Sequence, residues 1–323
     1  MRQRLVLGLV IALALLYPLV ASPYYATHML RFFAYAIVVL GLNLLFGYTG
    51  LLSFGHSLFL AVGAYTAAVL TSQLGIRSME VVLLAAALAS AAVAVPVGAL
   101  CVRYVRIYFA MLTLAFAMLF YSFLLKFYHL TGGDEGMRVV RPALLFVDFD
   151  GVPKTTFLSH HYYYYSAAVL LVLAVVMWRV VGSPFGLCLR AIRDNPEKAA
   201  ALAVSVTRYR WAAFVVSAVY AGIGGALLAP TTGQVDPGLA YWTHSGNLVF
   251  MTLLGGFTHF VGPVVGAFVF IHLQDQVMSL LPYWRLVFGA ILAAVVIFVP
   301  GGLMSLCSIR PRALRGRAPR TAA

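Results

Sequence analysis

Charged side chains are scarce in this chain. Of its 323 residues only 10% are Asp, Glu, Lys or Arg, and 9 are acidic, whereas 63% are hydrophobic. A typical soluble domain carries about 25% charged residues, so this composition excludes an ordinary soluble globular protein. It predicts a polytopic membrane protein instead.

The motifs of the common enzyme classes are also missing. A phosphate-binding loop ends in Gly-Lys-Ser or Gly-Lys-Thr, but none of Lys126, Lys154 and Lys198 follows a glycine. The sequence has no Gly-x-Ser-x-Gly, no His-Glu-x-x-His and no group of histidines and carboxylates at ligand spacing. We therefore expect no catalytic residue, no cofactor and no metal. If ATP energises this protein, another polypeptide hydrolyses it.

Cysteine is rare as well. Cys101, Cys188 and Cys307 are an odd number, so they cannot all pair, and their spacing is not that of a zinc site. The sequence thus predicts neither a disulfide framework nor a structural metal.

Long apolar runs are what the chain does contain. A hydrocarbon core about 30 Å thick is crossed by roughly 20 helical residues, and the runs show no alternation of period two that would indicate a barrel. The sequence predicts an all-α fold with about ten transmembrane helices, some of them short or broken at glycines. The predicted spans are Leu5–Ser22, Leu30–Phe46, Leu51–Ser72, Met79–Val102, Tyr108–Tyr128, Tyr162–Val181, Trp211–Ala229, Ser245–Phe257, Pro263–Leu281 and Trp284–Leu303.

The positive charges indicate the orientation of these spans. The net charge is +13, from 22 Lys and Arg against 9 Asp and Glu, and its placement fits the positive-inside rule better than nucleic-acid binding. With a cytoplasmic N-terminus, most basic residues fall on the inner side and both termini are cytoplasmic. This topology predicts a transmembrane domain over residues 1–308, a long outer loop at 131–161, a cytoplasmic loop at 182–210 and a basic cytoplasmic tail at 309–323. Four tyrosines after the outer loop, Tyr162 to Tyr165, are typical of an aromatic belt at the membrane interface.

The loop at 182–210 is the longest polar interruption, with the sequence GSPFGLCLRAIRDNPEKAAALAVSVTRYR. Asn195 is a good N-cap, Pro196 suits the first helical position and Glu197 favours the positive end of a helix, which predicts a helix from Pro196 toward Val206. We expect two short helices that dock a cytoplasmic partner; the alternative is an ordinary basic inner loop. The candidate docking residues are Arg190, Arg193, Asp194, Asn195, Pro196, Glu197 and Lys198.

Polar residues inside the spans are candidates for a solute pathway. Asn43 lies in the second predicted span and Ser53, His56 and Ser57 lie at the start of the third, where glycines crowd the sequence. Glycines at that density allow either a broken helix, whose free backbone groups hold a polar solute, or close helix packing. For the asparagine and the serines, interhelical hydrogen bonds are the plainer alternative.

A second glycine-rich run covers 253–268. Gly255 and Gly256 are pathway candidates, and Gly262-x-x-x-Gly266 forms a small face for helix contact. VVGAF in this run matches AVGAY at 61–65, which hints at an internal repeat. Farther along, His272 and Asp275 are spaced to share a helix face; they form either a proton relay or the water-exposed end of a span.

The whole sequence resembles a known family. GYTGLLSFGHSLFLAVGAY, RIYFAMLTLAFA, TGGDEGM, FGLCLRAIRDNPEKAAALAVSVTRYRWAAFVVSAVYAGIGGAL, LLGGFTHFVGPVVGAF and FVPGGL occur in the order found in LivM-type permeases of branched-chain amino acid ABC importers. The chain departs from that pattern at Ala203, where glycine is common, at Thr258 and His259, which replace a Gly-Ser pair, and at Gly301, which replaces an arginine.

The resemblance implies both partners and a location. It implies a heterodimer with a LivH-type permease, two ATPase subunits, an extracytoplasmic solute-binding protein and a place in the bacterial cytoplasmic membrane, with the 182–210 loop as the ATPase contact. The family also imports urea, short amides and aromatic acids, so the small-molecule substrate stays open. The rival class is a stand-alone secondary transporter with His272 and Asp275 as its ion site.

Overall fold

The chain folds as a bundle of apolar helices. The computed structural model describes residues 23–104, 107–149, 151–280, 283–299 and 301–307, so the predicted first span, Leu5–Ser22, and the basic tail at 309–323 lie outside the described residues. Six helices of the described part are long and apolar enough to cross a membrane. The prediction of a helical, polytopic membrane protein is confirmed, and the total of about ten spans stays a prediction.

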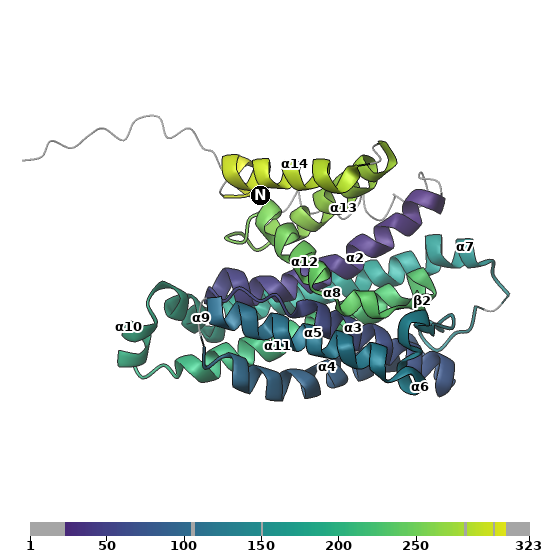
Figure 1. Cartoon of the computed structure of the whole chain (residues 1–323), viewed down its shortest axis with the longest axis horizontal. Coiled ribbons are helices and arrows are strands. Elements are labelled where there is room, and N and C mark those ends of the chain that lie inside the picture. The colour runs from purple at the N-terminus through teal and green to yellow at the C-terminus, as the bar shows by residue number, and fades with distance from the viewer. Residues whose placement is uncertain (1–22, 105–106, 150, 281–282, 300, 308–323) are drawn as a thin grey trace, which may run out of the picture.

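The long helices lie roughly side by side along the longest axis, as Figure 1 shows for α3, α4, α5, α8 and α11. The short helices α9 and α10 lie at one end of this bundle, α6 and α7 lie at the other, and α14 covers one side. The helical elements are α2 (Pro23–Asn43), α3 (His56–Ala68), α4 (Met79–Cys101), α5 (Ile107–Lys126), α6 (Tyr128–Thr131), α7 (Lys154–Thr156), α8 (Tyr163–Gly182), α9 (Pro184–Asp194), α10 (Pro196–Ala201), α11 (Val206–Thr232), α12 (Trp242–Gly255), α13 (Gly262–Leu280), α14 (Trp284–Phe298) and α15 (Leu303–Cys307).

Several of these helices are extended by short turns of other geometry. Wider π-helical turns continue α2 over Leu44–Tyr48, continue α3 over Val69–Gln73 and join α7 to α8 over Phe157–Tyr162. The described part contains one small antiparallel sheet, in which β1 (Met137–Arg138) pairs with β2 (Gln234–Val235).

Two helices form the centre of the bundle. The apolar windows of α2 and α11 are 83% and 78% buried, whereas those of α4 and α5 are 28% and 22% buried. On α4 a stripe of mostly small residues that includes Ala86, Ser90 and Ala94 is buried, while Leu84 and Leu88 on the other side are 63% exposed. Small residues let helix backbones approach within a membrane, and large apolar side chains suit the lipid-facing side.

Glycines set the closest approach between the central helices. A Cβ atom added at Gly63 on α3 would lie 1.9 Å from the carbonyl oxygen of Gly222 on α11, and one at Gly225 would lie 1.9 Å from the oxygen of Leu60. No real Cβ tolerates such a distance. The α3–α11 crossing therefore requires glycine on both helices.

Several predicted boundaries of helices and loops were wrong. The third span does not begin at Leu51, because Gly50 has φ +74° and residues 51–55 are irregular before α3 starts at His56. The helix predicted from Pro196 toward Val206 ends at Ala201, because Ala203 adopts φ +63°, a left-handed conformation in which a helix cannot continue. The position where the family commonly has glycine is thus one whose backbone favours glycine.

The loop predicted at 131–161 is shorter than expected. The sixth span begins at Lys154, so residues 154–161 are helical and the loop ends about two turns earlier. Tyr162 and Tyr163 lie within this helical segment, and their side chains are 0% and 1% exposed. The Tyr162 hydroxyl donates to the carbonyl of Leu227 at 2.8 Å. The aromatic-belt prediction was wrong for these two tyrosines.

We expect Gly63→Ala to lower the stability of the chain by about 1–3 kcal/mol, because the added methyl forces apart the α3–α11 crossing. The matched control is Gly289→Ala, which also lies within a helix but has nothing within 4 Å of the added Cβ. Thermal denaturation in detergent measures both. Equal melting temperatures for the two variants would show that the crossing is not close-packed in solution.

Candidate functional site

The irregular segment between α2 and α3 is mostly buried, and three of its amides are paired. The amide of Leu51 donates to the carbonyl of Leu45 at 3.1 Å, that of Phe54 donates to Thr113 Oγ1 at 3.2 Å and that of Gly55 donates to Ser53 Oγ at 3.3 Å. Non-helical backbone at membrane depth is stable where protein groups satisfy it. The segment is an irregular break between α2 and α3, and its glycines are also closely packed, since a Cβ at Gly47 or Gly55 would lie 2.5 Å from the carbonyl of Phe257 or Thr113.

His56 connects three helices at the end of this break. Ser217 on α11 donates its hydroxyl to the carbonyl of Gly41 on α2 at 2.7 Å. Because that hydrogen is used, Nε2 of His56 is the donor in its 2.6 Å contact with Ser217, and Nδ1 accepts from Ser53 Oγ at 3.0 Å. The imidazole is thus a neutral, fully buried link between α2, α3 and α11.

Ser57 makes a second link, from α3 to α12. Its amide donates to Ser245 Oγ at 2.9 Å, Ser245 Oγ donates to Ser57 Oγ at 2.8 Å, and Ser57 Oγ donates to the carbonyl of Ala240 at 3.0 Å. Both hydroxyls are completely buried. This is the interhelical hydrogen bond that the sequence left as the alternative to a solute contact.

The remaining pathway candidates also lie in the interior. Asn43 is 2% exposed and its Oδ1 has no partner among the described residues. Gly255 and Gly256 lie where α12 ends against α13, and a Cβ at Gly255 would be 1.8 Å from the carbonyl of Gly262. The Gly262–Gly266 face is confirmed as a helix contact, since a Cβ at Gly266 would be 1.9 Å from the carbonyl of Met251.

A polar stripe on α12 was missed by the sequence analysis. Thr243 is exposed and Asn247 half-exposed, and Phe250 on the same face is 41% exposed. The spacing of four and three residues places all three on one side of the helix. An asparagine that faces outward within an apolar chain is costly against lipid, so this side favours contact with another subunit or with water. A 14-residue helix gives too weak a periodic signal to reveal it.

The loop at 182–210 forms the two short helices expected from its sequence. Asn195 caps α10, with its Oδ1 accepting from the amide of Lys198 at 2.9 Å, and Pro196 occupies the first helical position. Glu197 and Lys198 are exposed on α10, as is Asp194 at the end of α9.

The two arginines of α9 point back toward the bundle. Arg193 donates to the carbonyl of Gly47, and its guanidinium lies 5.5 Å from the centre of the Phe257 ring. Arg190 lies 5.1 Å from the centre of the Tyr48 ring. Helix α9 therefore contacts both the end of α2 and the loop between α12 and α13. These contacts could not be read from the sequence, because their partners are about 145 and 65 residues away.

Asp275 is paired with α2 and not with His272. Its carboxylate lies 3.1 Å from Nδ1 of His28 and 3.7 Å from Arg31, while Nδ1 of His272 lies 2.8 Å from the carbonyl of Phe268 on its own helix. The arrangement needed for a His272–Asp275 relay is absent. In the described part of the chain, no group of three or more His, Cys, Asp or Glu residues is arranged to hold a metal.

At the opposite end of the bundle, the loop that follows α6 is held against the end of α11. The β1–β2 pair and the bond from the Val139 amide to the Gly233 carbonyl at 3.0 Å join the two segments. Arg141 donates to the carbonyls of Phe149 and Val152 at 2.9 and 2.7 Å, which fixes the middle of the loop.

The described helices thus form a helical membrane domain, with an irregular break between α2 and α3 and paired short helices at one end. A family model described as the permease component of branched-chain amino acid transport systems matches residues 24–298. The chain belongs to this family, which makes it a permease of an ABC transporter.

Curated relatives agree with the family. The branched-chain amino acid permease LivM of Salmonella typhimurium is 28% identical over 98% of this chain and 78% of its own length, and LivM of Escherichia coli is 27% identical over 94% and 76%. The nucleoside permease NupC of Lactococcus lactis is 34% identical, over 29% of this chain and 26% of its own length. No solved structure matches.

We expect Ser217→Ala to destabilise the chain by about 1–3 kcal/mol, because it leaves Nε2 of His56 and the Gly41 carbonyl buried without a partner. Ser122→Ala, at an exposed position of α5, is the control and should change stability by less than about 0.5 kcal/mol. Thermal denaturation in detergent measures the difference. If Ser217→Ala melts with the control, the network does not hold the three helices together.

Proposed function

We propose that the chain is the permease subunit of an ABC importer for branched-chain amino acids and forms half of the translocation pathway. Two LivM relatives that match over nearly the whole chain support this substrate, whereas the nucleoside permeases match over about a third of it or less. Nucleosides, urea, short amides and aromatic acids remain the alternative substrates. ATP hydrolysis belongs to a separate subunit.

The proposed complex contains a LivH-type permease as the heterodimer partner, two ATPase subunits and an extracytoplasmic solute-binding protein. We place it in the bacterial cytoplasmic membrane, with residues 1–308 as the transmembrane domain and both termini, including the tail at 309–323, in the cytoplasm. The loop at 182–210 then faces the ATPase and the loop within 131–161 faces the binding protein.

The observation that carries this proposal is the pair of contacts made by α9. Asp194, Glu197 and Lys198 offer a polar surface for the ATPase, and the exposed Arg190 and Arg193 contact Tyr48, Gly47 and Phe257. Because α9 contacts the end of α2 and the loop after α12, a partner that displaces α9 displaces both of these segments. Coupling requires that the two ATPase states contact this surface differently.

The buried candidates support a wall behind the pathway. Ser53, His56 and Ser57 make hydrogen bonds at the break between α2 and α3, where Asn43 is buried, and Gly255 and Gly256 lie at the α12–α13 crossing. We propose that the solute itself passes along the side of α12 that the other helices of this chain leave uncovered. This side lies between the chain and its permease partner, and Thr243 and Asn247 supply its polar groups.

The rival of a gradient-driven secondary transporter has no support in the ion-site geometry. Asp275 is engaged by His28 and Arg31, and His272 is engaged by its own helix.

The coupling surface and the contacts behind it can be separated in the reconstituted complex. We expect the double variant Glu197→Ala with Lys198→Ala to weaken ATPase binding. Arg193→Gln should keep the ATPase bound but reduce uptake per ATP by about tenfold, because the link to Gly47 and Phe257 is lost. Arg179→Gln, at the end of α8, is the control. Co-purification, ATP hydrolysis and uptake of labelled leucine provide the measurements. Unchanged uptake per ATP in Arg193→Gln would refute the transmission role.

The pathway proposal predicts water beside α12. In a background with the native cysteines replaced, we expect Asn247→Cys in proteoliposomes to react with a membrane-impermeant maleimide, at a rate that changes when ATP and vanadate trap the ATPase. Leu88→Cys, 63% exposed on the lipid side of α4, is the control and should stay unreactive. An Asn247→Cys variant as inert as the control in both nucleotide states would place the pathway elsewhere.

A further inference from the structure

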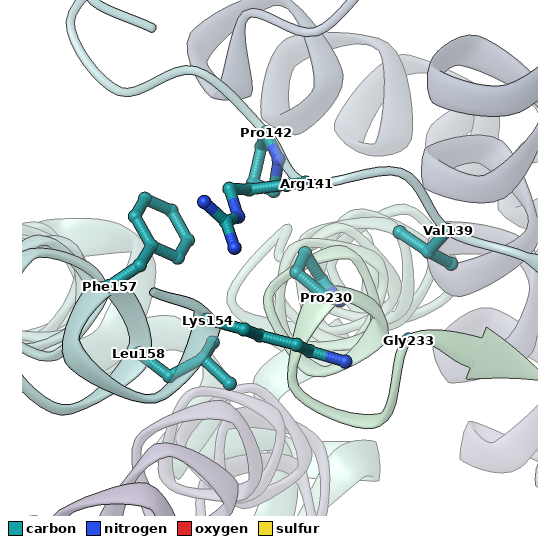
Figure 2. Close-up of a pocket in the computed structure, with 8 residues that line it drawn as sticks. All are labelled: Val139, Arg141, Pro142, Lys154, Phe157, Leu158, Pro230 and Gly233. Carbon is teal, nitrogen blue, oxygen red and sulfur yellow. The ribbon is translucent and has the colours of Figure 1, made fainter. Parts of the chain in front are cut away.

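A cavity of about 180 Å³ lies between the loop at 137–153 and the end of α11. Figure 2 shows the side chains of Arg141 and Lys154 entering it from different segments, with Lys154 reaching toward Gly233. Its lining is formed by Val139, Arg141, Pro142, Lys154, Phe157, Leu158, Pro230 and Gly233. Two of these residues are cations, none is acidic, and five are apolar.

Neither cation has a carboxylate partner in the part of the chain that the structure describes. Arg141 uses its Nη1 on the carbonyls of Phe149 and Val152 and lies 5.2 Å from the centre of the Phe157 ring, which leaves its other nitrogens free of described partners. Lys154 makes no described hydrogen bond or ion pair, and its Nζ lies 3.1 Å from the position of a Cβ at Gly233. Two like charges held at one cavity repel each other and raise the local positive potential, so an anion stabilises them.

The shape and lining define the anion. A guanidinium and an ammonium that line one cavity favour an anion such as a carboxylate, and proline, leucine, valine and phenylalanine side chains suit a short aliphatic group. The volume of about 180 Å³ is below the roughly 300 Å³ at which sites for larger ligands begin, which suits a molecule the size of an amino acid.

We propose that this cavity binds a carboxylate group attached to a short branched aliphatic chain. Its position on the outer face rests on the proposed function, whereas the binding itself does not. Two sources supply this chemistry: a free branched-chain carboxylate, and an acidic side chain of the solute-binding protein beside an apolar one. No acidic residue of the lining is available for an ammonium group, so the carboxylate end is the part recognised.

Binding of isocaproate to the full chain in nanodiscs, followed by calorimetry, tests the proposal. Isoamylamine carries the same branched tail with an ammonium instead of a carboxylate and should not bind. Lys154→Gln should weaken isocaproate binding by about tenfold or more, because it removes a charge-assisted bond, while Lys154→Arg restores it. Lys126→Gln, which removes an exposed cation at the end of α5, is the matched control and should bind like the unaltered chain.

The second arm separates the two sources. If isocaproate does not bind but Lys154→Gln weakens capture of the solute-binding protein by the chain, and Lys126→Gln does not, the carboxylate belongs to the binding protein. Binding of neither, or isocaproate binding that Lys154→Gln and Lys126→Gln leave equal, overturns the proposal. Absence of ATP-driven uptake would refute the proposed function but not isocaproate binding, so the two failures are distinguishable. Equal melting temperatures of the variants and the unaltered chain exclude misfolding as the cause.

Discussion

Backbone groups inside a membrane must find their partners within the protein, and the structure depends on how this chain meets that constraint. Helices satisfy it by themselves, but residues 50–55 form a break between α2 and α3. The break persists because Ser53 and Thr113 side chains accept from its amides and because neighbouring helices enclose it. The hydroxyl of Thr113 on α5 therefore helps to stabilise the backbone of the break.

The same constraint explains why glycine and serine, and not large apolar residues, occupy the helix crossings. A break can be enclosed only where helices approach closely, and α11 approaches α2, α3 and α4 through Gly224, Gly225 and Gly222 in turn. At such distances serine hydroxyls reach the opposite backbone, as Ser217 does to Gly41 at 2.7 Å. Small residues at the helix crossings thus allow both the close packing and the buried hydrogen bonds.

The sequence predicts those features whose signal is local. Hydrophobic runs identified the long helices, Asn195-Pro196 identified the cap of α10, and the Gly262–Gly266 spacing identified a helix contact. Boundaries shifted where the backbone departs from a regular helix, as at Ala203, since a positive φ leaves no pattern in hydropathy.

The site was less predictable because its partners are distant in sequence. His56 stood out as a histidine in an apolar run, but its partner Ser217 is 161 residues away, so a link between helices and a solute contact looked alike. The spacing of His272 and Asp275 left a relay and a water-exposed span end as alternatives, whereas packing of α13 on α2 brings His28 and Arg31 to Asp275. The polar side of α12 required knowing which side the other helices cover.

The placement of α11 joins the two ends of the proposed machine. It begins at Val206, directly after the coupling helices, and ends at Thr232, next to the cavity lined by Arg141 and Lys154. A 27-residue helix spans about 40 Å at 1.5 Å per residue, the thickness of a bilayer with its headgroups. Its glycines do not make it a hinge, because each is held against a neighbouring backbone or side chain at the crossings. In the proposed mechanism, a displacement imposed at α10 reaches the other end of the bundle along α11. By linkage, any ligand that binds the outer end differently in the two positions changes the affinity of the inner partner by the same factor.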